Sequence, residues 1–474
     1  MNGLSIRAWL VPLSEQVRNS YWFVPSLMAI GSIILSLVTT SIDSRIGADW
    51  MNDIDWLNAN QPAGARAVLS TVAGSMITVA GVTFSMTILS ISSATTQVGP
   101  RLLNNFMADK ANQFTLGVFI ATFLYCLMVL RTVRNAESLP PGADSGMDLA
   151  SAFVPHLSVM VGVLMAIASV GVLIFYIHHI PETIHVSNII ANVGRQLDVQ
   201  IDGQFPARVG QVNDEGSVVE RVALLPPMFD ESAARVLAGK TGYLQYIDGG
   251  GLIEIAREHD LVLHVQPSPG DFVTSLTVLV LASPRERITN DIERELASMF
   301  VSGAQRSANQ DLRFLINQLV EVAMRALSPG VNDPFTAISC MQWLQSGLES
   351  LADRELPASA RYDEEGELRM VAAPVTFAAF ASLVFDQLRP YVAADRNASV
   401  SMMEMLGNLT VQVPSPSDRR LIARHACALR RACEQSQSDT RTLALISSLY
   451  REVLCLLVDT DRRTRARQTG QWIR

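Results

Sequence analysis

The stretch that decides the fold runs from Gly81 to Arg134 and reads GVTFSMTILSISSATTQVGPRLLNNFMADKANQFTLGVFIATFLYCLMVLRTVR. An apolar run rich in hydroxyl side chains ends near Ile91, and a second apolar run extends from Phe114 to Leu130. A basic elbow that turns at Gly99-Pro100-Arg101 separates them. Because each run is long enough to cross a bilayer and proline ends a helix, the stretch predicts a transmembrane hairpin.

The composition divides the chain into an apolar first third and a more polar remainder. Of the 474 residues 49% are hydrophobic, and the mean hydropathy is +0.24, which is high for a soluble protein. The net charge of −8 argues against nucleic acid as a partner, since proteins that bind it normally present a basic surface. The five cysteines show no Cys-x-x-Cys spacing, and four lie in the polar part, where we expect free thiols.

Four segments are long and apolar enough to span a membrane, at about residues 22–42, 68–91, 114–130 and 153–177. Together they predict a four-helix transmembrane domain over residues 1–180. The first segment is expected to be retained, because it is long and no Ala-x-Ala-like cleavage site follows it. Basic residues gather before the first segment and in the elbow, whereas the loop after the first segment is acidic. The positive-inside rule therefore places both termini in the cytoplasm.

The four predicted spans contain no Asp, Glu, Lys or Arg. Ion-coupled carriers usually place an ionisable side chain at membrane depth, where it binds the coupled ion. The sequence therefore argues against an ion-coupled transporter. It leaves open a pore lined by hydroxyl groups or an uncharged constriction.

Small and hydroxyl side chains recur along the second span at a spacing that keeps them near one helix face. The set consists of Thr71, Gly74, Ser75, Thr78, Gly81, Ser85 and Ser92. One interpretation is a face for close helix–helix packing, which is the commonest use of such residues in membranes. The other is a face in contact with water or ions, and both can hold in an oligomer whose second spans meet at the axis.

A short histidine-containing segment follows the fourth span. His178, Glu182 and His185 would share one helical face, and their side chains are of the types that bind zinc. Pro181 interrupts this turn, and histidines at a membrane edge often have no ligand role. We therefore assign no metal here, and metal binding stays an open alternative.

The polar part predicts a cytosolic α+β domain. Residues 181–230 indicate a juxtamembrane helix and linker, and residues 231–283 a small β-rich, barrel-like unit, because β-branched runs alternate with Pro-Gly turns. Residues 284–458 carry amphipathic helical patterns, and residues 459–474 predict a loose basic tail. The turn Pro269-Gly270-Asp271-Phe272-Val273 is similar to one in barrel domains that carry lipoyl or biotin groups. The lysine that those domains modify is missing, so we expect no such cofactor.

A polar motif marks the break between two predicted helices of the C-terminal part. It contains Ser328, Pro329, Gly330, Asn332, Asp333 and Pro334. Gly330 suits the break, Asp333 suits the N-cap and Pro334 suits the first helical position. The alternative is an anion site at the start of the next helix, which the acidic cap opposes. The sequence therefore favours capping and turn formation.

Three stretches, in matching order, resemble the bacterial membrane-protein family DUF2254, for which no activity is established. They are the run from Phe84 to Leu103 with residues 124–133 after it, the Pro269–Val273 turn, and the highly specific stretch from Arg325 to Ala337. The resemblance covers nearly the whole chain. It implies a multi-span protein of the bacterial inner membrane with a cytosolic domain, and it implies no established activity and no catalytic residue. We expect no cofactor.

The sequence contains none of the common local motifs of an enzyme. It has no P-loop, GxGxxG, GxSxG or HExxH, so we expect no catalysis and assign no catalytic residue. The pattern favours a channel-like protein with a cytosolic domain that assembles or gates it. Four spans are too few to enclose a wide pore, so this role requires a homo-oligomer in the lipid bilayer. The alternative is a membrane-anchored sensor or scaffold.

Overall fold

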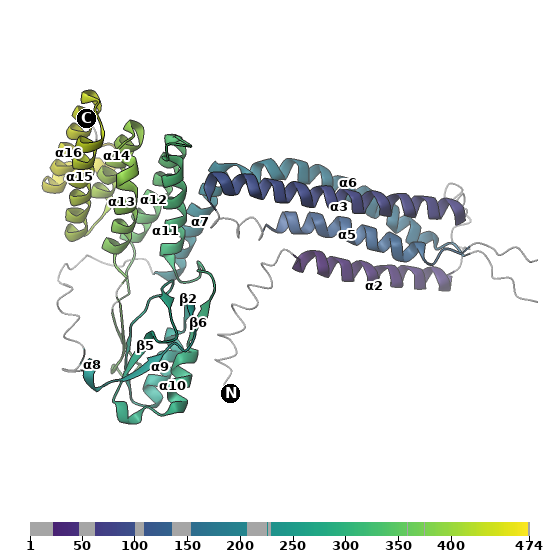
Figure 1. Cartoon of the computed structure of the whole chain (residues 1–474), viewed down its shortest axis with the longest axis horizontal. Helices are drawn as coiled ribbons and strands as arrows, with labels where there is room; N and C mark the ends of the chain where they lie inside the picture. The colour runs from purple at the N-terminus through teal and green to yellow at the C-terminus, as the bar shows by residue number, and fades with distance from the viewer. Residues whose placement is uncertain are drawn as a thin grey trace, which may run out of the picture. The chain divides into compact units, whose positions relative to one another are not determined.

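A computed structural model describes residues 22–46, 62–99, 109–134, 153–205, 225, 229–357, 359–373 and 375–472 (Figure 1). The chain forms two compact units, and we describe each by itself. The membrane unit consists mainly of the helices between residues 13 and 185, and the C-terminal unit consists mainly of Val186–Arg474. The predicted elbow after Gly99 lies mostly outside the described residues.

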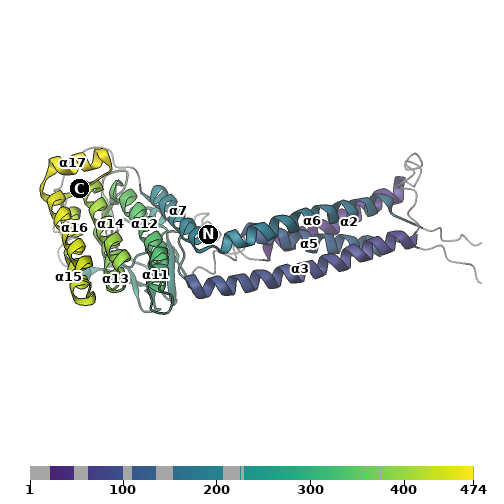
Figure 2. The same ribbon diagram turned by 90° about the horizontal axis from the view of Figure 1, so that it is seen from above.

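Four apolar helices make up the membrane unit and confirm the four predicted segments (Figures 1 and 2). They are α2 (Phe23–Ile46), α3 (Pro62–Val98), α5 (Lys110–Leu130) and α6 (His156–Ile184). Helix α3 has 37 residues and is therefore longer than the predicted segment 68–91. At 1.5 Å per residue it measures roughly 55 Å, well beyond the roughly 30 Å of a hydrocarbon core.

Helix α5 is the centre of the membrane unit. In its apolar window 56% of the residues are buried, against 22–28% in the other three spans. Its Phe119 and Tyr125 are fully enclosed, and Tyr125 packs in one cluster with Leu69 of α3 and Val159 of α6. At Gly117 the backbone approaches α2 so closely that a Cβ atom would lie 2.5 Å from the sulfur of Met28.

A buried carboxylate joins the end of α2 to the start of α6. Asp43 accepts hydrogen bonds from the backbone N–H groups of Leu157 and Ser158 at 3.0 Å each, and from the Ser158 hydroxyl at 2.6 Å. Tyr125 donates its hydroxyl to the Ser158 carbonyl at 3.1 Å. Asp43 therefore satisfies N–H groups in the first turn of α6 that would otherwise lack acceptors.

The C-terminal unit contains two open sheets. The larger has the strand order β1-β5-β3-β8-β7, in which only β3 and β8 run parallel, and the smaller has the order β4-β2-β6. The strands are β1 (Ala234–Leu237), β2 (Gly242–Ile247), β3 (Val262–Val265), β4 (Phe272–Val273), β5 (Val278–Ser283), β6 (Phe300–Gly303), β7 (Ala360–Tyr362) and β8 (Leu368–Ala372). The expected β unit at 231–283 is thus incomplete, because β6, β7 and β8 come from later in the chain. Neither strand order closes into a barrel.

Two helices bury the apolar surface of these strands (Figure 1). They are α9 (Gly249–Glu258) and α10 (Asn290–Ser298), and α8 (Phe229–Ser232) and the short 3-10 helix η4 (Arg285–Arg287) flank the larger sheet. Leu252 of α9 and Leu296 of α10 pack in one cluster with Leu263 and Val280 of the sheet. The alternating apolar positions of the strands supply this core.

The remaining helices pack into a second layer of the C-terminal unit (Figure 1). They are α7 (Val186–Gln204), α11 (Leu312–Ala326), α12 (Pro334–Ala352), α13 (Phe377–Val392), α14 (Arg396–Gln412), α15 (Pro416–Ser436), α16 (Thr440–Val458) and α17 (Thr460–Thr469). Helices α7 and α12 come close where Gly194 lies against Trp343 and Gly347 lies against Leu197. The predicted juxtamembrane helix is therefore built into the fold of this unit.

The predicted loose tail is wrong, because residues 460–469 form α17. Asp459 caps this helix by accepting from Arg462 N at 2.9 Å. Beyond it, Trp472 is only 7% exposed, covers Gly407 of α14 and donates its indole N–H to Asn408 at 2.6 Å. The sequence pattern missed this packing because the anchoring residue lies 64 positions away from its partner.

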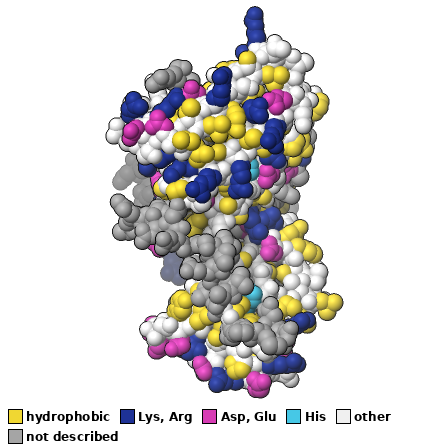
Figure 3. Space-filling view, turned by 90° about the vertical axis from the view of Figure 1, so that its left-hand side faces the viewer, with side chains coloured by type: hydrophobic (Ala, Val, Ile, Leu, Met, Phe, Trp, Pro, Cys, Tyr) yellow, Lys and Arg dark blue, Asp and Glu magenta, His cyan; other side chains and the backbone are white. Residues whose placement is uncertain are grey.

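The last three helices carry a basic surface that the overall charge of −8 conceals (Figure 3). Between Pro416 and Trp472 the chain has eleven arginines and six acidic residues. The exposed arginines are Arg420, Arg424, Arg431, Arg441, Arg451, Arg465 and Arg467. The net charge therefore describes the average of the chain and does not describe this surface.

Candidate functional site

The strand layer and the helix layer of the C-terminal unit line a cavity of about 580 Å³ that is open to solvent. Its wall combines the end of α7, the start of α9, strands β3, β7 and β8, and the first turns of α11 and α13. The apolar lining consists mainly of Phe205, Ile253, Val265, Met370, Phe380 and Leu383. This volume lies in the range of small-molecule sites, and mostly apolar walls with a few polar groups are typical of them.

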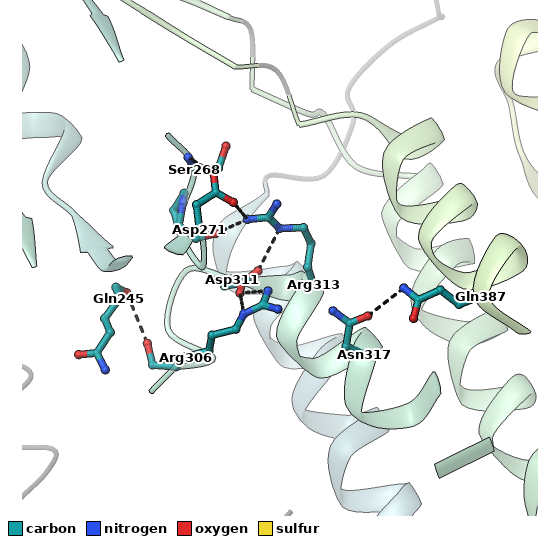
Figure 4. Close-up of polar contacts among 10 residues, drawn as sticks. Gln245, Ser268, Asp271, Arg306, Asp311, Arg313, Asn317 and Gln387 are labelled. Atoms are coloured by element: carbon teal, nitrogen blue, oxygen red, sulfur yellow. Dashed lines mark hydrogen bonds and ion pairs between the residues drawn. The ribbon is translucent and has the colours of Figure 1, made fainter. Parts of the chain in front are cut away.

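Asp311 and Arg313 line one side of the cavity and belong to a network of two arginines and two carboxylates (Figure 4). Arg306 donates through Nε to Asp311 at 2.9 Å, and Arg313 donates through Nε to the same carboxylate at 3.3 Å. Arg313 also reaches Asp271 at 2.9 Å. Asp311 is only 3% exposed, so its negative charge is buried, and the two arginines compensate it.

Arg313 remains charged within this network. Burial acts to lower the pKa of Arg313, but the hydrogen bond to Asp271 and the charge of Asp311 outweigh it, so that the pKa is raised above its usual value. Arg313 also donates to the carbonyl oxygen of Pro269 at 2.6 Å. It therefore ties the start of α11 to the turn before β4.

The turn Pro269-Gly270-Asp271 closes the network. Gly270 has a positive φ of 87°, and a Cβ atom there would overlap the Asp311 carboxylate. Only glycine permits this approach. The sequence correctly predicts a turn, but nothing local reveals that it packs on Asp311, which lies about 40 residues later in the chain.

A glycine-rich helix start forms another part of the lining. Asp248 caps α9 by accepting from Gly251 N at 3.0 Å, and Gly249 and Gly250 line the cavity. Gln310 holds the preceding strand, accepting from Ile247 N at 2.8 Å and donating to Ile247 O at 3.1 Å. The backbone at this helix start is therefore fixed in position. Because glycine has no side chain, the cavity wall at Gly249 and Gly250 consists of backbone.

Arg361 of β7 is the remaining charged residue of the lining. Its side chain is exposed, and within the described part of the chain it makes no ion pair. Arg369 on the neighbouring strand differs, since it pairs with Asp260 at 2.7 Å and Asp363 at 2.6 Å. The cavity therefore has one arginine whose charge is not matched by a carboxylate of the described residues.

The small-residue face of α3 is exposed throughout. Its hydroxyl groups donate to carbonyls of their own helix, as Ser75 does to Thr71 O at 2.7 Å and Ser85 does to Gly81 O at 2.9 Å. Apart from the backbone of α3 itself and the neighbouring residues of the chain, no described atom lies within 4 Å of a Cβ built at Gly74 or Gly81. These residues therefore do not pack against other described helices of the same chain. The neighbours that can cover them are another copy of the chain, lipid or water.

The polar motif at the α11–α12 break has the capping geometry that the sequence favours. Asp333 accepts from Thr336 N at 3.1 Å and from the Thr336 hydroxyl at 2.6 Å, and Pro334 begins the helix. The hydrogen bond from Thr336 lowers the pKa of Asp333. Asn332 adopts a φ of 50°, and Ser328 donates to Arg325 O at 2.6 Å. Pro329 and Gly330 form the exposed turn between them.

The histidine segment after the fourth span does not gather into a triad. His178 lies 3.5 Å from Glu182 on the exposed side of α6, whereas His185 follows the helix end. His179, which the sequence pattern did not select, instead contacts Asp109 at 3.1 Å. Among the described residues, no group of three His, Cys, Asp or Glu side chains has the geometry to hold a metal ion.

Comparison with known proteins gives the family. The family model described as predicted membrane protein (DUF2254) matches residues 18–408. The chain belongs to the DUF2254 family. The match includes all four spans and every residue of the cavity lining, whereas α15, α16 and α17 lie beyond it.

Two similar relatives carry no assigned activity. Uncharacterized proteins of Mycobacterium bovis and of Mycobacterium tuberculosis are each 29% identical to this DUF2254 protein over 437 residues, which cover 91% of this chain and 80% of the relative. No solved structure matches the chain. A function is therefore inferred from the site itself.

Proposed function

We propose that this DUF2254 protein is a membrane-anchored sensor whose C-terminal unit binds a small molecule in the cytosol. The observation that carries the proposal is the cavity of about 580 Å³ between the strand layer and the helix layer. The protein lies in the bacterial inner membrane with both termini in the cytoplasm, as the distribution of basic residues favours. The anchor holds the sensing unit at the membrane surface.

The construction of the cavity suits binding better than catalysis. Its polar side chains are largely occupied in fixing the wall, as Asp311 is by Arg306 and Thr376 is by capping α13. No described lining residue forms a nucleophile–base pair of the kind used in covalent catalysis. The lining offers shape, apolar surface and a few charges, which support recognition of a ligand.

The cavity is also placed where a ligand can change the protein. A bound molecule would contact α9 and β8 of one layer together with α13 of the other. A ligand that binds only this arrangement stabilises it in proportion to its affinity and concentration. Binding would therefore strengthen the association of the two layers, and that change is the signal we propose.

The test uses the full chain in lipid nanodiscs and a library of water-soluble metabolites. A ligand at about 100 times its Kd should stabilise the protein by about 2.7 kcal/mol, which raises Tm by roughly 5–10 °C. Ala379→Trp places a large side chain in the cavity and should abolish this rise, whereas Ala444→Trp on the exposed side of α16 should not. Equal shifts in both variants for every active compound would disprove binding in the cavity.

The second candidate is a channel-like homo-oligomer, and the exposed small-residue face of α3 favours it. Seven residues that permit close approach or contact with water lie uncovered along a helix whose opposite face is packed. An oligomer in which these faces meet would enclose hydroxyl groups at membrane depth. The C-terminal unit would then assemble or gate the oligomer.

A further inference from the structure

We infer that the cavity takes an amphipathic anion, a molecule with an apolar body and one carboxylate or phosphate at its end. The inference rests on the proposed ligand-binding function and names the class of ligand. Its two parts correspond to two regions of the lining, an apolar wall and an unmatched arginine.

The apolar body is selected by the wall between the two layers. Met370 and Val265 come from adjacent strands of the larger sheet, and Phe380 and Leu383 face the same cavity from α13. Burial of apolar surface is favourable in proportion to its area, so a wall of this kind favours an aromatic or aliphatic body over a sugar or a free inorganic ion. A purely polar ligand would leave this surface in contact with water.

The anionic end is selected by Arg361. The two other arginines of the neighbourhood, Arg306 and Arg313, are matched by the two carboxylates Asp271 and Asp311, so that network is neutral. Arg361 adds a charge that forms no ion pair with a carboxylate of the described residues. A guanidinium presents several donors in a fixed plane and binds carboxylates and phosphates in two-point geometry.

The start of α9 adds shape to the site and no preference for charge. Gly249 and Gly250 line the cavity at the N-terminal end of a ten-residue helix, and the carboxylate of Asp248, which caps Gly251 N at 3.0 Å, offsets the positive end of the helix dipole. The preference for an anion therefore rests on Arg361, and a cationic ligand would meet that side chain and is disfavoured.

The experiment compares three probes that share one apolar body: 4-phenylbutyrate, 4-phenylbutanol and 4-phenylbutylammonium. Each is titrated by calorimetry into the full chain in nanodiscs of zwitterionic lipid, with empty nanodiscs subtracted. We expect the acid to bind at least tenfold more tightly than the alcohol, and the ammonium to bind most weakly. Phenyl phosphate and laurate distinguish a phosphate head group and a lipid-derived chain from a soluble carboxylate.

Variants assign the preference to the arginine. Arg361→Gln should reduce the affinity for the acid to that for the alcohol, Arg361→Lys should retain part of the difference, and Arg294→Gln on exposed α10 should change nothing. Equal affinity for acid and alcohol, both lost in Ala379→Trp, would overturn the ligand class and leave the binding function standing. Binding of the acid that persists unchanged in both Arg361→Gln and Ala379→Trp would overturn the site as well.

Discussion

Gly270 is the residue whose replacement should be tolerated least in the arginine–carboxylate network. Its φ of 87° is unfavourable for other residues, and a Cβ atom would overlap Asp311. We expect Gly270→Ala to destabilise the protein by about 1–3 kcal/mol from backbone strain alone, measured by thermal unfolding. Gly330→Ala is the matched control, because no described atom beyond its chain neighbours lies within 4 Å of its Cβ position. Equal Tm values for the two variants would show that the close approach at Gly270 is absent.

Asp333 gives a prediction about pH. The pKa of Asp333 is lowered in the folded protein, chiefly by the Thr336 hydroxyl, so its ionised form stabilises the fold. This stabilisation is complete above about pH 4, the pKa of an unfolded aspartate, and is lost as the pH falls through the lower folded value. Asp333→Ala should cost about 0.5–2 kcal/mol at pH 7, and Asp333→Asn should cost less, since asparagine also caps helices. Loss of ligand binding in Asp333→Ala at an unchanged Tm would instead indicate a binding role for the motif.

At the scale of elements, α3 has one packed face and one uncovered face. Ala73, Met76 and Ala80 face α5 and α6, whereas Thr78 and Ser85 are exposed. If the uncovered face lines water in an oligomer, cysteines introduced at Thr78 and Ser85 should react with a small water-soluble thiol reagent. Cysteines at Ala73 and Ala80 should not react, because both positions pack against α5 and α6. Protection at all four positions would remove the support for a channel-like role.

The last helix gives a second prediction at this scale. Trp472 covers Gly407 and bonds to Asn408, so the segment after α16 is held by α14. We expect Trp472→Ala to cost about 3–5 kcal/mol, the usual loss for a buried tryptophan. Gln471→Ala, next to it and exposed, should leave the unfolding temperature within about 1 °C of wild type, because exposed substitutions usually change little. If the tail were loose, Trp472→Ala and Gln471→Ala would both leave the unfolding temperature almost unchanged.

The sequence predicts the elements of this protein better than their assembly. Hydropathy and helical periodicity locate four spans and most helices of the C-terminal unit, because these signals are local. The N-cap at Asp333 and the first helical position at Pro334 are also set by local sequence. The cavity is not set by local sequence, because its lining combines residues 204–205, 249–253 and 361–383, and no pattern reveals that they meet. For the same reason the predicted β unit at 231–283 does not contain β6, β7 and β8.

At the scale of the whole molecule, the helix ends of the membrane unit support the proposed topology. Asp43 at the end of α2 bonds to the start of α6, and Arg66 near the start of α3 donates to Val133 O just after α5 at 2.7 Å. His179 near the end of α6 contacts Asp109 just before α5. These contacts fit four spans that alternate in direction, so an even number of crossings returns the chain to the side where it began.

The distribution of basic residues then decides which side that is. Arg7, Arg18, Arg101 and Lys110 mark one side, and the segment from Asp43 to Asp55, with four aspartates, marks the other. We therefore expect a fluorescent protein fused after the C-terminus to fluoresce and alkaline phosphatase fused there to be inactive. Phosphatase inserted between α5 and α6 should be active and serves as the control. An active C-terminal phosphatase would place the cavity outside the cytoplasm, where the proposed sensor would have to read a periplasmic ligand.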